Sequence, residues 1–289
     1  MKKKKKIMLL PYLLIMPVIV LLTIFKIYPF VKTMISSFSI TTPIGEWLGW
    51  AGLDNWKMVF TDSGLGKIMG TTFIFAGMNL VMVFSCAMIL ALLADGLKKK
   101  GKRSIQTMYA LPLAIASSPA ALIWGFILRK EGGILNQILG TNVAWLQDTD
   151  TALLMVAIVT SWTHIASSFI LLLAGFKNVS EELLEAATLD GANAFTKVTK
   201  IKIPLASSQI FFVLFLNIVQ SFKTFGQIRL LTAGGPAGST TTLMYQIYER
   251  GSESGFFEIA CCYSVVLFLT IFIMTRIQFL FEKKFVHYQ

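Results

Sequence analysis

The sequence predicts an all-α integral membrane protein with six transmembrane helices and both termini in the cytosol. Three observations support this fold class. Of the 289 residues, 55% are apolar and only 14% are charged, whereas a soluble domain is about 45 to 50% apolar and about 25% charged. Six stretches are apolar over the roughly 20 residues that a helix needs to cross a bilayer. The Lys and Arg residues, which outnumber Asp and Glu by 26 to 15, are unevenly divided between the loops.

The predicted spans are residues 7–31, 71–94, 105–128, 152–176, 203–222 and 259–281. The first follows a run of lysines at 2–6, as in a signal peptide. It is too long for one and lacks a cleavage site of small residues, so we expect an uncleaved anchor. The third contains Pro112 and Pro119, with Ser117 and Ser118 between them, and we expect it to be kinked or locally unwound.

The loop charges orient the spans, because short cytosolic loops are enriched in Lys and Arg. One face carries 17 of the 26 basic residues, in the N-terminal run, in residues 98–103 and 177–202, and at the C-terminal end. The other face carries 9, spread over longer loops. Six acids lie on the first face and nine on the second, so the whole net charge of +11 lies on the predicted cytosolic face. The basic composition is therefore a topology signal, and we expect no nucleic-acid partner.

The outer face has three substantial segments, 32–70, 129–151 and 223–258, which we expect to form short interfacial helices and turns. Their tryptophans fit the membrane interface better than a ligand-stacking role; they are Trp47, Trp50, Trp56 and Trp145. The cysteines lie inside apolar runs without zinc or redox spacing, which favours simple packing; they are Cys86, Cys261 and Cys262.

The longest cytosolic segment, residues 180–204, predicts two short helices joined by a tight turn. Ser180 can cap the first helix, acids follow in its first turn, and Gly191 can end it in a left-handed conformation. The first helix would group Leu183, Leu184, Ala187 and Thr188 on one face, and the second would group Phe195, Val198 and Ile201, with Lys197, Lys200 and Lys202 elsewhere. Pro204 would lie in the first turn of span five. Such an element can dock into a partner's groove or lie on the bilayer surface, and these physical arguments leave both open.

The residue spacing favours docking into a partner over lying on the bilayer surface. Glu185-Ala186-Ala187, Gly191 after three residues, and Ile201-x-Ile203-Pro204 after nine more resemble the EAA signature of binding-protein-dependent ABC importer permeases. Ile203 replaces the usual Leu of that signature, which is a mild aliphatic change. The signature also lies where that family has it, in the last long cytosolic loop between two spans.

Two outer segments extend the resemblance. Residues 52–56, GLDNW, resemble an element of the carbohydrate-permease branch, and residues 231–236, LTAGGP, with Thr240, Thr242, Leu243 and Ile247-Tyr248, are similar to that branch's segment after span five. The pattern departs from the branch after Tyr248. The resemblance favours the maltose or glycerol-3-phosphate type, as the first of its two paired permeases.

This resemblance implies a single transmembrane permease domain over residues 1–289, in the plasma membrane of a bacterium or archaeon. Its partners would be a second homologous permease, two ABC ATPases that hold ATP and Mg, and an extracytoplasmic binding protein that delivers a carbohydrate. The chain lacks a GxxxxGK[ST] phosphate loop, so we expect neither enzymatic activity nor a cofactor of its own. In the segment 180–204, called the coupling segment below, Glu185 would contact the ATPase, Ala186 and Ala187 would allow close approach, Gly191 would form the turn, and Ile201 and Pro204 would complete the junction to span five.

A solute path should use polar groups that face the bundle interior, because such groups are costly toward lipid. Span five offers Asn217, Gln220, Ser221, Lys223 and Thr224, and span four offers Ser161, Thr163, His164, Ser167 and Ser168. Packing between helices is the alternative role for each. A proton- or sodium-coupled secondary transporter is the competing class; it is disfavoured by the lack of a carboxylate within a span and of an inverted repeat. A monosaccharide, an oligosaccharide and glycerol-3-phosphate all remain possible solutes.

Overall fold

The computed structural model describes residues 10–96 and 115–285, and its contacts group them into two compact units. Unit 1 comprises Met1–Asp62 and Ile247–Val266, and unit 2 comprises Ser63–Gln246 and Leu267–Gln289. The single permease domain stays a prediction.

Within the described residues, four helices are long and apolar enough to cross a membrane: Pro11–Ser36, Leu65–Gly96, Ala152–Lys177 and Phe257–Glu282. They correspond to predicted spans one, two, four and six. Span five is a pair of helices, Ala194–Leu205 and Ser207–Phe222, bent by 71° at the break between them. About half of predicted span three lies outside the described residues. Its described remainder is the 11-residue helix α6 (Ser117–Ile127), which starts after an extended Ala116. The described residues therefore support four or five of the six expected spans.

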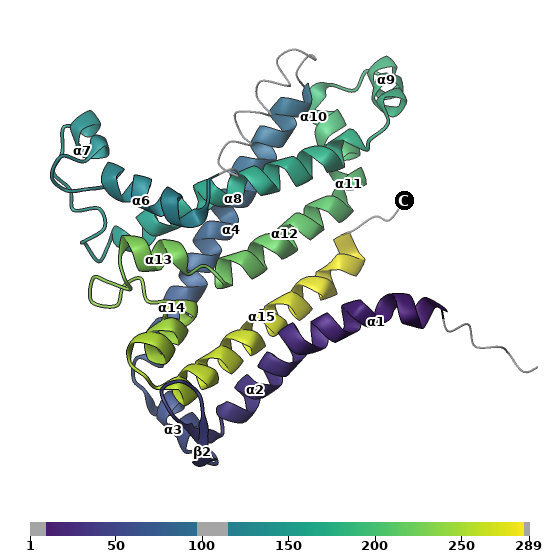
Figure 1. The fold of residues 1–289 in the computed structure, drawn as a ribbon. Coiled ribbons are helices and arrows are strands. Elements are labelled where there is room, and N and C mark those ends of the chain that lie inside the picture. The colour runs from purple at the N-terminus through teal and green to yellow at the C-terminus, as the bar shows by residue number, and fades with distance from the viewer. Residues whose placement is uncertain (1–9, 97–114, 286–289) are drawn as a thin grey trace, which may run out of the picture. The chain divides into compact units, whose positions relative to one another are not determined.

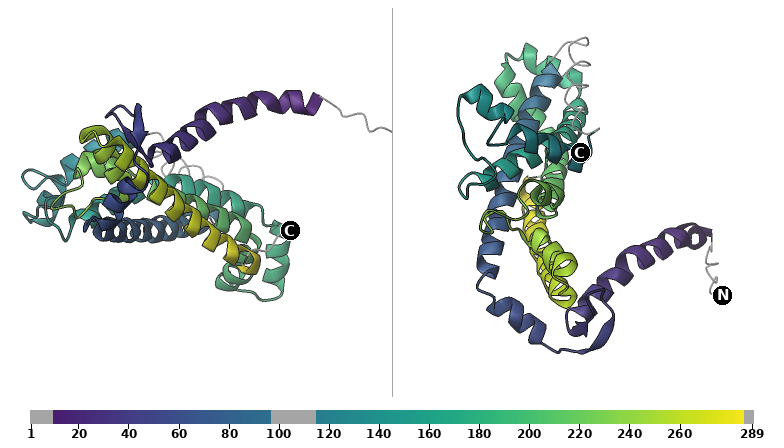
Figure 2. Two further views of the ribbon diagram at one scale, coloured as in Figure 1. Left: turned by 90° about the horizontal axis from the view of Figure 1, so that it is seen from below. Right: turned by 60° about the vertical axis from the view of Figure 1, so that its left-hand side comes forward.

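Unit 1 begins with α1 (Leu10–Leu22), the π-helical turn η1 (Thr23–Ile27) and α2 (Tyr28–Ser36), which follow one another as a continuous, gently curved rod (Figure 2). The wide turn η1 precedes Pro29, whose ring would clash with the carbonyl of Phe25 in a regular α-helix. The same pattern recurs in unit 2, where the π-helical turn η2 (Lys197–Lys202) precedes Pro204. A locally widened helix is thus the response to proline at both places.

The remainder of unit 1 includes a small β-hairpin that the all-α prediction missed. Strands β1 (Ser39–Thr41) and β2 (Trp47–Trp50) pair antiparallel, with Ser39 opposite Trp50. Gly45, at φ +82°, supplies the left-handed residue of the connecting turn. The strands are too short, and show too little alternation of apolar and polar residues, to be recognised from the sequence. The unit is completed by α3 (Asp54–Thr61), the π-helical turn η3 (Glu249–Glu253) and the first part of α15 (Phe257–Phe285).

Unit 2 is built on α4 (Leu65–Gly96), α8 (Ala152–Lys177) and α12 (Ser207–Phe222), which pack against one another (Figure 1). On α4, small residues at helical spacing face α8 and let the two helices approach closely. The core joins Ala87, Ala91 and Ala94 to Phe169, Leu172, Leu173 and Phe176 of α8, and includes Ala206 and Val213. The C-terminal part of α15 also packs on α12, where Gln278 Nε2 donates to the carbonyl of Phe211 at 3.2 Å. Apart from the helices of the coupling segment, the shorter described helices of this unit are α6, α7 (Ile134–Leu139), α13 (Gly226–Leu231) and α14 (Leu243–Tyr248), the last of which ends in unit 1.

The four outer-face tryptophans divide into two kinds. Trp47 and Trp50 are exposed and pack edge to face, as an interfacial pair would. Trp56 instead stacks on Phe60, with ring centroids 5.8 Å apart. Trp145 donates from Nε1 to Asn136 Oδ1 at 2.9 Å. Trp56 and Trp145 thus also make contacts within the chain, and the interface role of the four tryptophans stays a prediction. Cys86, Cys261 and Cys262 are all free thiols.

Candidate functional site

The coupling segment folds as the two short helices that its sequence predicts. The first is α9 (Glu181–Leu189), and the second comprises α10 (Ala194–Thr196), η2 and α11 (Ile203–Leu205). Gly191 lies between them at φ +84°, and its amide donates to the carbonyl of Thr188 at 3.1 Å. Ser180 occupies the N-cap position, but its side chain makes no capping bond. The predicted glycine turn is thus confirmed, and the predicted serine cap is not.

The surface of this segment is unusually apolar. No residue of α9 is buried, and Leu189 and Phe195 keep 90% and 75% of their accessible surface. Glu185, one turn before Leu189 on α9, is also exposed and has no hydrogen-bond or ion-pair partner among the residues that the structure describes. Exposed large apolar side chains together with an unpaired carboxylate are features that a protein partner can cover.

Polar contacts within the segment hold the two helices together. Lys197 Nζ donates to Thr188 Oγ1 at 3.0 Å, which joins the second helix to the first. Asn193 caps the second helix by accepting from the amide of Thr196 at 2.8 Å. The segment therefore presents its apolar side chains on a defined frame. In Figure 1, α9 and α10 lie beyond the same end of α8.

An ion pair joins the segment to the bundle of unit 2. Lys202, in η2, pairs with Asp95 in the last turn of α4, and both side chains are largely buried. The helix then bends by 71° at Ala206 before α12 begins at Ser207. Pro204 thus lies before the bend, in the first turn of α11, and its place at the start of the membrane span stays a prediction. Its missing amide and the π-helical turn before it are both recognised causes of helix kinks.

Of the five path residues predicted on span five, three are buried inside unit 2. The amide of Asn217, 2% exposed, exchanges hydrogen bonds with the hydroxyl of Ser168 on α8, at 3.1 and 3.2 Å. Ser221 donates to the carbonyl of Asn217 at 2.8 Å, and Thr224 to that of Gln220 at 3.2 Å. These bonds are the interhelical and backbone contacts named above as the alternative role of such residues.

The other two path residues are accessible. Gln220 is partly exposed and Lys223 is exposed at the C-terminal end of α12. Among the predicted residues of span four, Thr163 and Ser167 donate to backbone carbonyls of their own helix. The structure therefore brings Asn217 and Ser168 together, and leaves Gln220 and Lys223 reachable.

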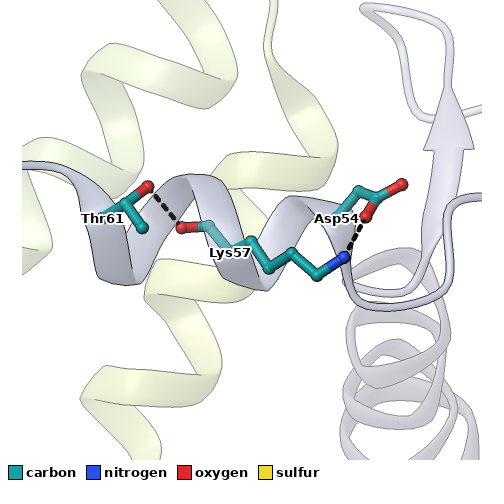
Figure 3. Close-up of polar contacts among 3 residues, drawn as sticks. All are labelled: Asp54, Lys57 and Thr61. Carbon is teal, nitrogen blue, oxygen red and sulfur yellow. Dashed lines mark hydrogen bonds and ion pairs between the residues drawn. The ribbon is translucent and has the colours of Figure 1, made fainter.

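The residues 52–56 also have a structural role. The side-chain amide of Asn55 is buried and donates to the carbonyls of Ser37 and Ser39, at 3.2 and 2.9 Å. Figure 3 shows the exposed side of the same helix, where Lys57 pairs with Asp54 at 2.8 Å and Thr61 donates to the carbonyl of Lys57. The motif thus fastens α3 to the end of α2 and the start of β1.

Residues 86–287 match the sequence profile of the family described as "Binding-protein-dependent transport system inner membrane component". The chain belongs to this family. The matched range includes the coupling segment, α8 and α12. The protein is accordingly an inner membrane permease of a binding-protein-dependent transport system, and a multi-pass membrane protein.

Two relatives of this permease cover almost all of it. The sn-glycerol-3-phosphate transport system permease protein UgpA of Agrobacterium fabrum is 34% identical over 284 residues, which is 97% of each chain. The protein of the same name from Rhizobium meliloti is 31% identical, again over 97% of each chain.

Solved structures agree on the fold. A bacterial ABC transporter described as importing the acidic polysaccharide alginate superimposes with a TM-score of 0.85 at 21% identity, over 96% of each chain. The same transporter with a periplasmic protein bound to an alginate pentasaccharide gives a TM-score of 0.84 at 20% identity, covering 95% of this permease and 94% of that chain. The permease therefore has the fold of an ABC importer's membrane subunit.

Several buried polar atoms of unit 2 have no hydrogen-bond partner among the described residues: those of the Asn79 side chain, the hydroxyls of Ser161 and Ser239, Nδ1 of His164 and Oε1 of Gln278. Asn79 was not selected from the sequence, although it is a polar residue inside an otherwise apolar span, and that signal was available. Leu189 was also missed, because an exposed leucine next to a glycine turn has no distinctive sequence pattern.

Proposed function

We propose that this permease pairs with a second, homologous permease to form the path for a carbohydrate or carbohydrate-like solute. Two ATPase subunits, which hold the ATP and Mg, bind at the coupling segment, and an extracytoplasmic binding protein delivers the solute on the opposite face. The relatives named for sn-glycerol-3-phosphate and the fold shared with an alginate importer support this solute class.

The observation that carries the proposal is the surface of the coupling segment. Its EAA-type residues stand beside exposed apolar side chains, and its own contacts fix the frame without covering them. Closure of the ATPase pair would push on α9 and move the spans as rigid bodies, which alternates access to the path. The Lys202 pair with Asp95 provides a link along which this motion reaches α4.

Within the path, Gln220 and Lys223 are the better candidates for solute contact, since their side chains are accessible. Asn217, Ser221 and Thr224 would act by holding α12 in place. A secondary transporter receives no support from the described spans, in which Asp95 and Glu258 lie in terminal turns and Asp95 is paired with Lys202.

The test is co-purification of the ATPases with the permease from membranes. Phe195→Asp places a charge on the exposed apolar surface, and we expect it to reduce both co-purification and solute uptake at least tenfold. Ile138→Asp is the matched control, because Ile138 on α7 is equally exposed, at 76%, and lies in a predicted outer segment. Equal ATPase recovery with Phe195→Asp and the unaltered protein would overturn the proposal.

A further inference from the structure

A pocket of about 310 Å³ lies in unit 2 between the end of α6, the segment that follows it, and the turn after α13. Both segments belong to the face that the loop charges predict to be outside the cell. Its lining includes the polar residues Arg129, Lys130, Gln147 and Thr232 and the apolar residues Leu128 and Leu231. A concave apolar site with a few convergent polar groups is the usual form of a small-molecule site, and this volume is at the lower end of that class.

The charges in this pocket are all positive. Arg129 and Lys130 are exposed and have no carboxylate partner among residues 10–96 and 115–285. Glu131 and Asp148, the nearest acids in the chain, do not line the pocket. The guanidinium carbon of Arg129 lies 4.3 Å from the ring centre of Phe126, which restricts where the arginine can point. Two adjacent cations without counter-charges attract an anion.

The buried side-chain amide of Asn136 holds the backbone of Arg129 and Lys130 in place. Asn136 Nδ2 donates to the carbonyls of Arg129 and Lys130, at 3.2 and 3.0 Å, and to that of Val143 at 2.9 Å. Asn136 Oδ1 accepts from Trp145 Nε1 at 2.9 Å and from the amide of Val143 at 3.2 Å. The cation-bearing residues are thereby tied to the segment that carries Ala144, Leu146 and Gln147 on the other side of the pocket.

The remaining wall is equally constrained. Thr240 donates to the carbonyl of Gly235 at 2.8 Å, and its hydroxyl also shares a 2.7 Å hydrogen bond with Thr232. The amide of Gly235 donates to the carbonyl of Thr232 at 2.9 Å. A pocket with ordered walls loses little freedom when a ligand binds, which favours affinity.

We propose that this pocket binds the anionic group of the transported solute, a carboxylate or a phosphate, before the solute enters the path. The inference rests on the proposed transport function and narrows its solute class to acidic or phosphorylated sugars and polyols. Arg129 supplies planar paired donors for the two oxygens of such a group, and Lys130 supplies a mobile point charge. A neutral sugar would offer no negative charge to pair with Arg129 and Lys130.

The experiment measures uptake by cells that express the complete transporter. The phosphate arm uses labelled sn-glycerol-3-phosphate and glucose 6-phosphate, the carboxylate arm uses glucuronate and diglucuronate, and glycerol, glucose and maltose are the neutral comparators. The double variant Arg129→Gln with Lys130→Gln removes both charges, whereas Arg129→Lys with Lys130→Arg keeps them. Lys57→Gln is the matched control on another outer segment, and immunoblots report the amount of permease in the membrane.

We expect uptake of an anion from one arm, with a KM that rises at least tenfold in the Gln variant and stays within threefold of the unaltered value in the charge-retaining variant. Uptake of neutral solutes alone, or of no anion, would overturn the inference. So would an unchanged KM in the Gln variant, or an equal loss for neutral and anionic solutes, which would indicate docking of the binding protein. Recovery of the ATPases with the permease, measured in the same membranes, shows separately whether the proposed function stands.

Discussion

The coupling segment and the outer turn of residues 231–246 are both short helical elements with left-handed glycines, yet their side chains are arranged in opposite ways. The outer turn buries Leu243 and Tyr245, and the amide of Leu243 donates to Thr72 Oγ1 on α4 at 2.9 Å. The coupling segment leaves Leu189 and Phe195 exposed. The outer turn is therefore completed by its own chain, whereas the coupling segment has an apolar surface that its own chain does not cover.

The largest effect is expected from a substitution of Gly191, the glycine at the turn of the coupling segment. Gly191→Val should abolish uptake and the coupling of ATP hydrolysis, because a branched residue resists the left-handed conformation at φ +84°. Apart from the residue itself and its two chain neighbours, no described atom lies within 4 Å of the position that a Cβ would take, so folding and membrane insertion should persist. Uptake assays, with immunoblots of the membrane fraction, measure both effects.

Gly191→Asn is the control for that substitution, since Asn tolerates the left-handed region and should retain most activity. Full uptake by the Val variant would show that the turn conformation is not needed for coupling.

In the outer turn, the expected effect is on stability instead. Gly234→Ala should lower the free energy of unfolding by about 2 to 4 kcal/mol, because left-handed strain adds to a clash. The new Cβ would lie 2.6 Å from Tyr245 Cε1 and 2.8 Å from Thr241 Oγ1. Thermal unfolding of the full chain in detergent measures the change. Gly238→Ala has similar strain, at φ +72°, but its new Cβ would have no contact closer than 3.7 Å. It should therefore lower the free energy of unfolding by less than Gly234→Ala does. Equal losses of stability in the two variants would contradict the role of the clash.

The tie between the coupling segment and α4 should have an intermediate effect. Lys202→Met leaves the largely buried Asp95 carboxylate without this cation, and we expect a loss of about 1.5 to 3 kcal/mol in stability together with weaker ATPase coupling. Exchanging the two, as Asp95→Lys with Lys202→Asp, should recover part of both. Normal coupling in the Lys202→Met variant would show that the motion reaches the bundle by another route.

The smallest effect is expected at the ion pair of Figure 3. Asp54 and Lys57 are 73% and 72% exposed, so Lys57→Gln should change stability by less than about 0.5 kcal/mol and leave uptake unaltered. A larger loss of thermal stability would mean that α3 depends on its surface charge, and not on the buried bonds of Asn55.

Much of the fold could be predicted from the sequence because long apolar runs have few alternatives in a membrane. The helices of spans one, two, four and six follow from that constraint alone. The bend in span five could not be placed: Pro204 is visible in the sequence, but the helix breaks two residues later, at Ala206. The hairpin at residues 39–50 depends on pairing across a turn, which no single periodic pattern records.

The candidate site divides in the same way. The residue types and spacing of the EAA segment, the glycine turn and the charge asymmetry are properties of the sequence, because they depend on local conformation and on counting. The sequence does not determine which side chains are accessible to a solute or a partner. Asn217 and Ser221 have the same polar character as Gln220 and Lys223, yet the first two are bound inside the bundle and the second two are accessible. Likewise, only folding brings residues 125–147 and 231–236 around one pocket and leaves Arg129 and Lys130 without acids in its lining. Burial and long-range contacts decide these points, because they depend on neighbours that lie far apart in the chain.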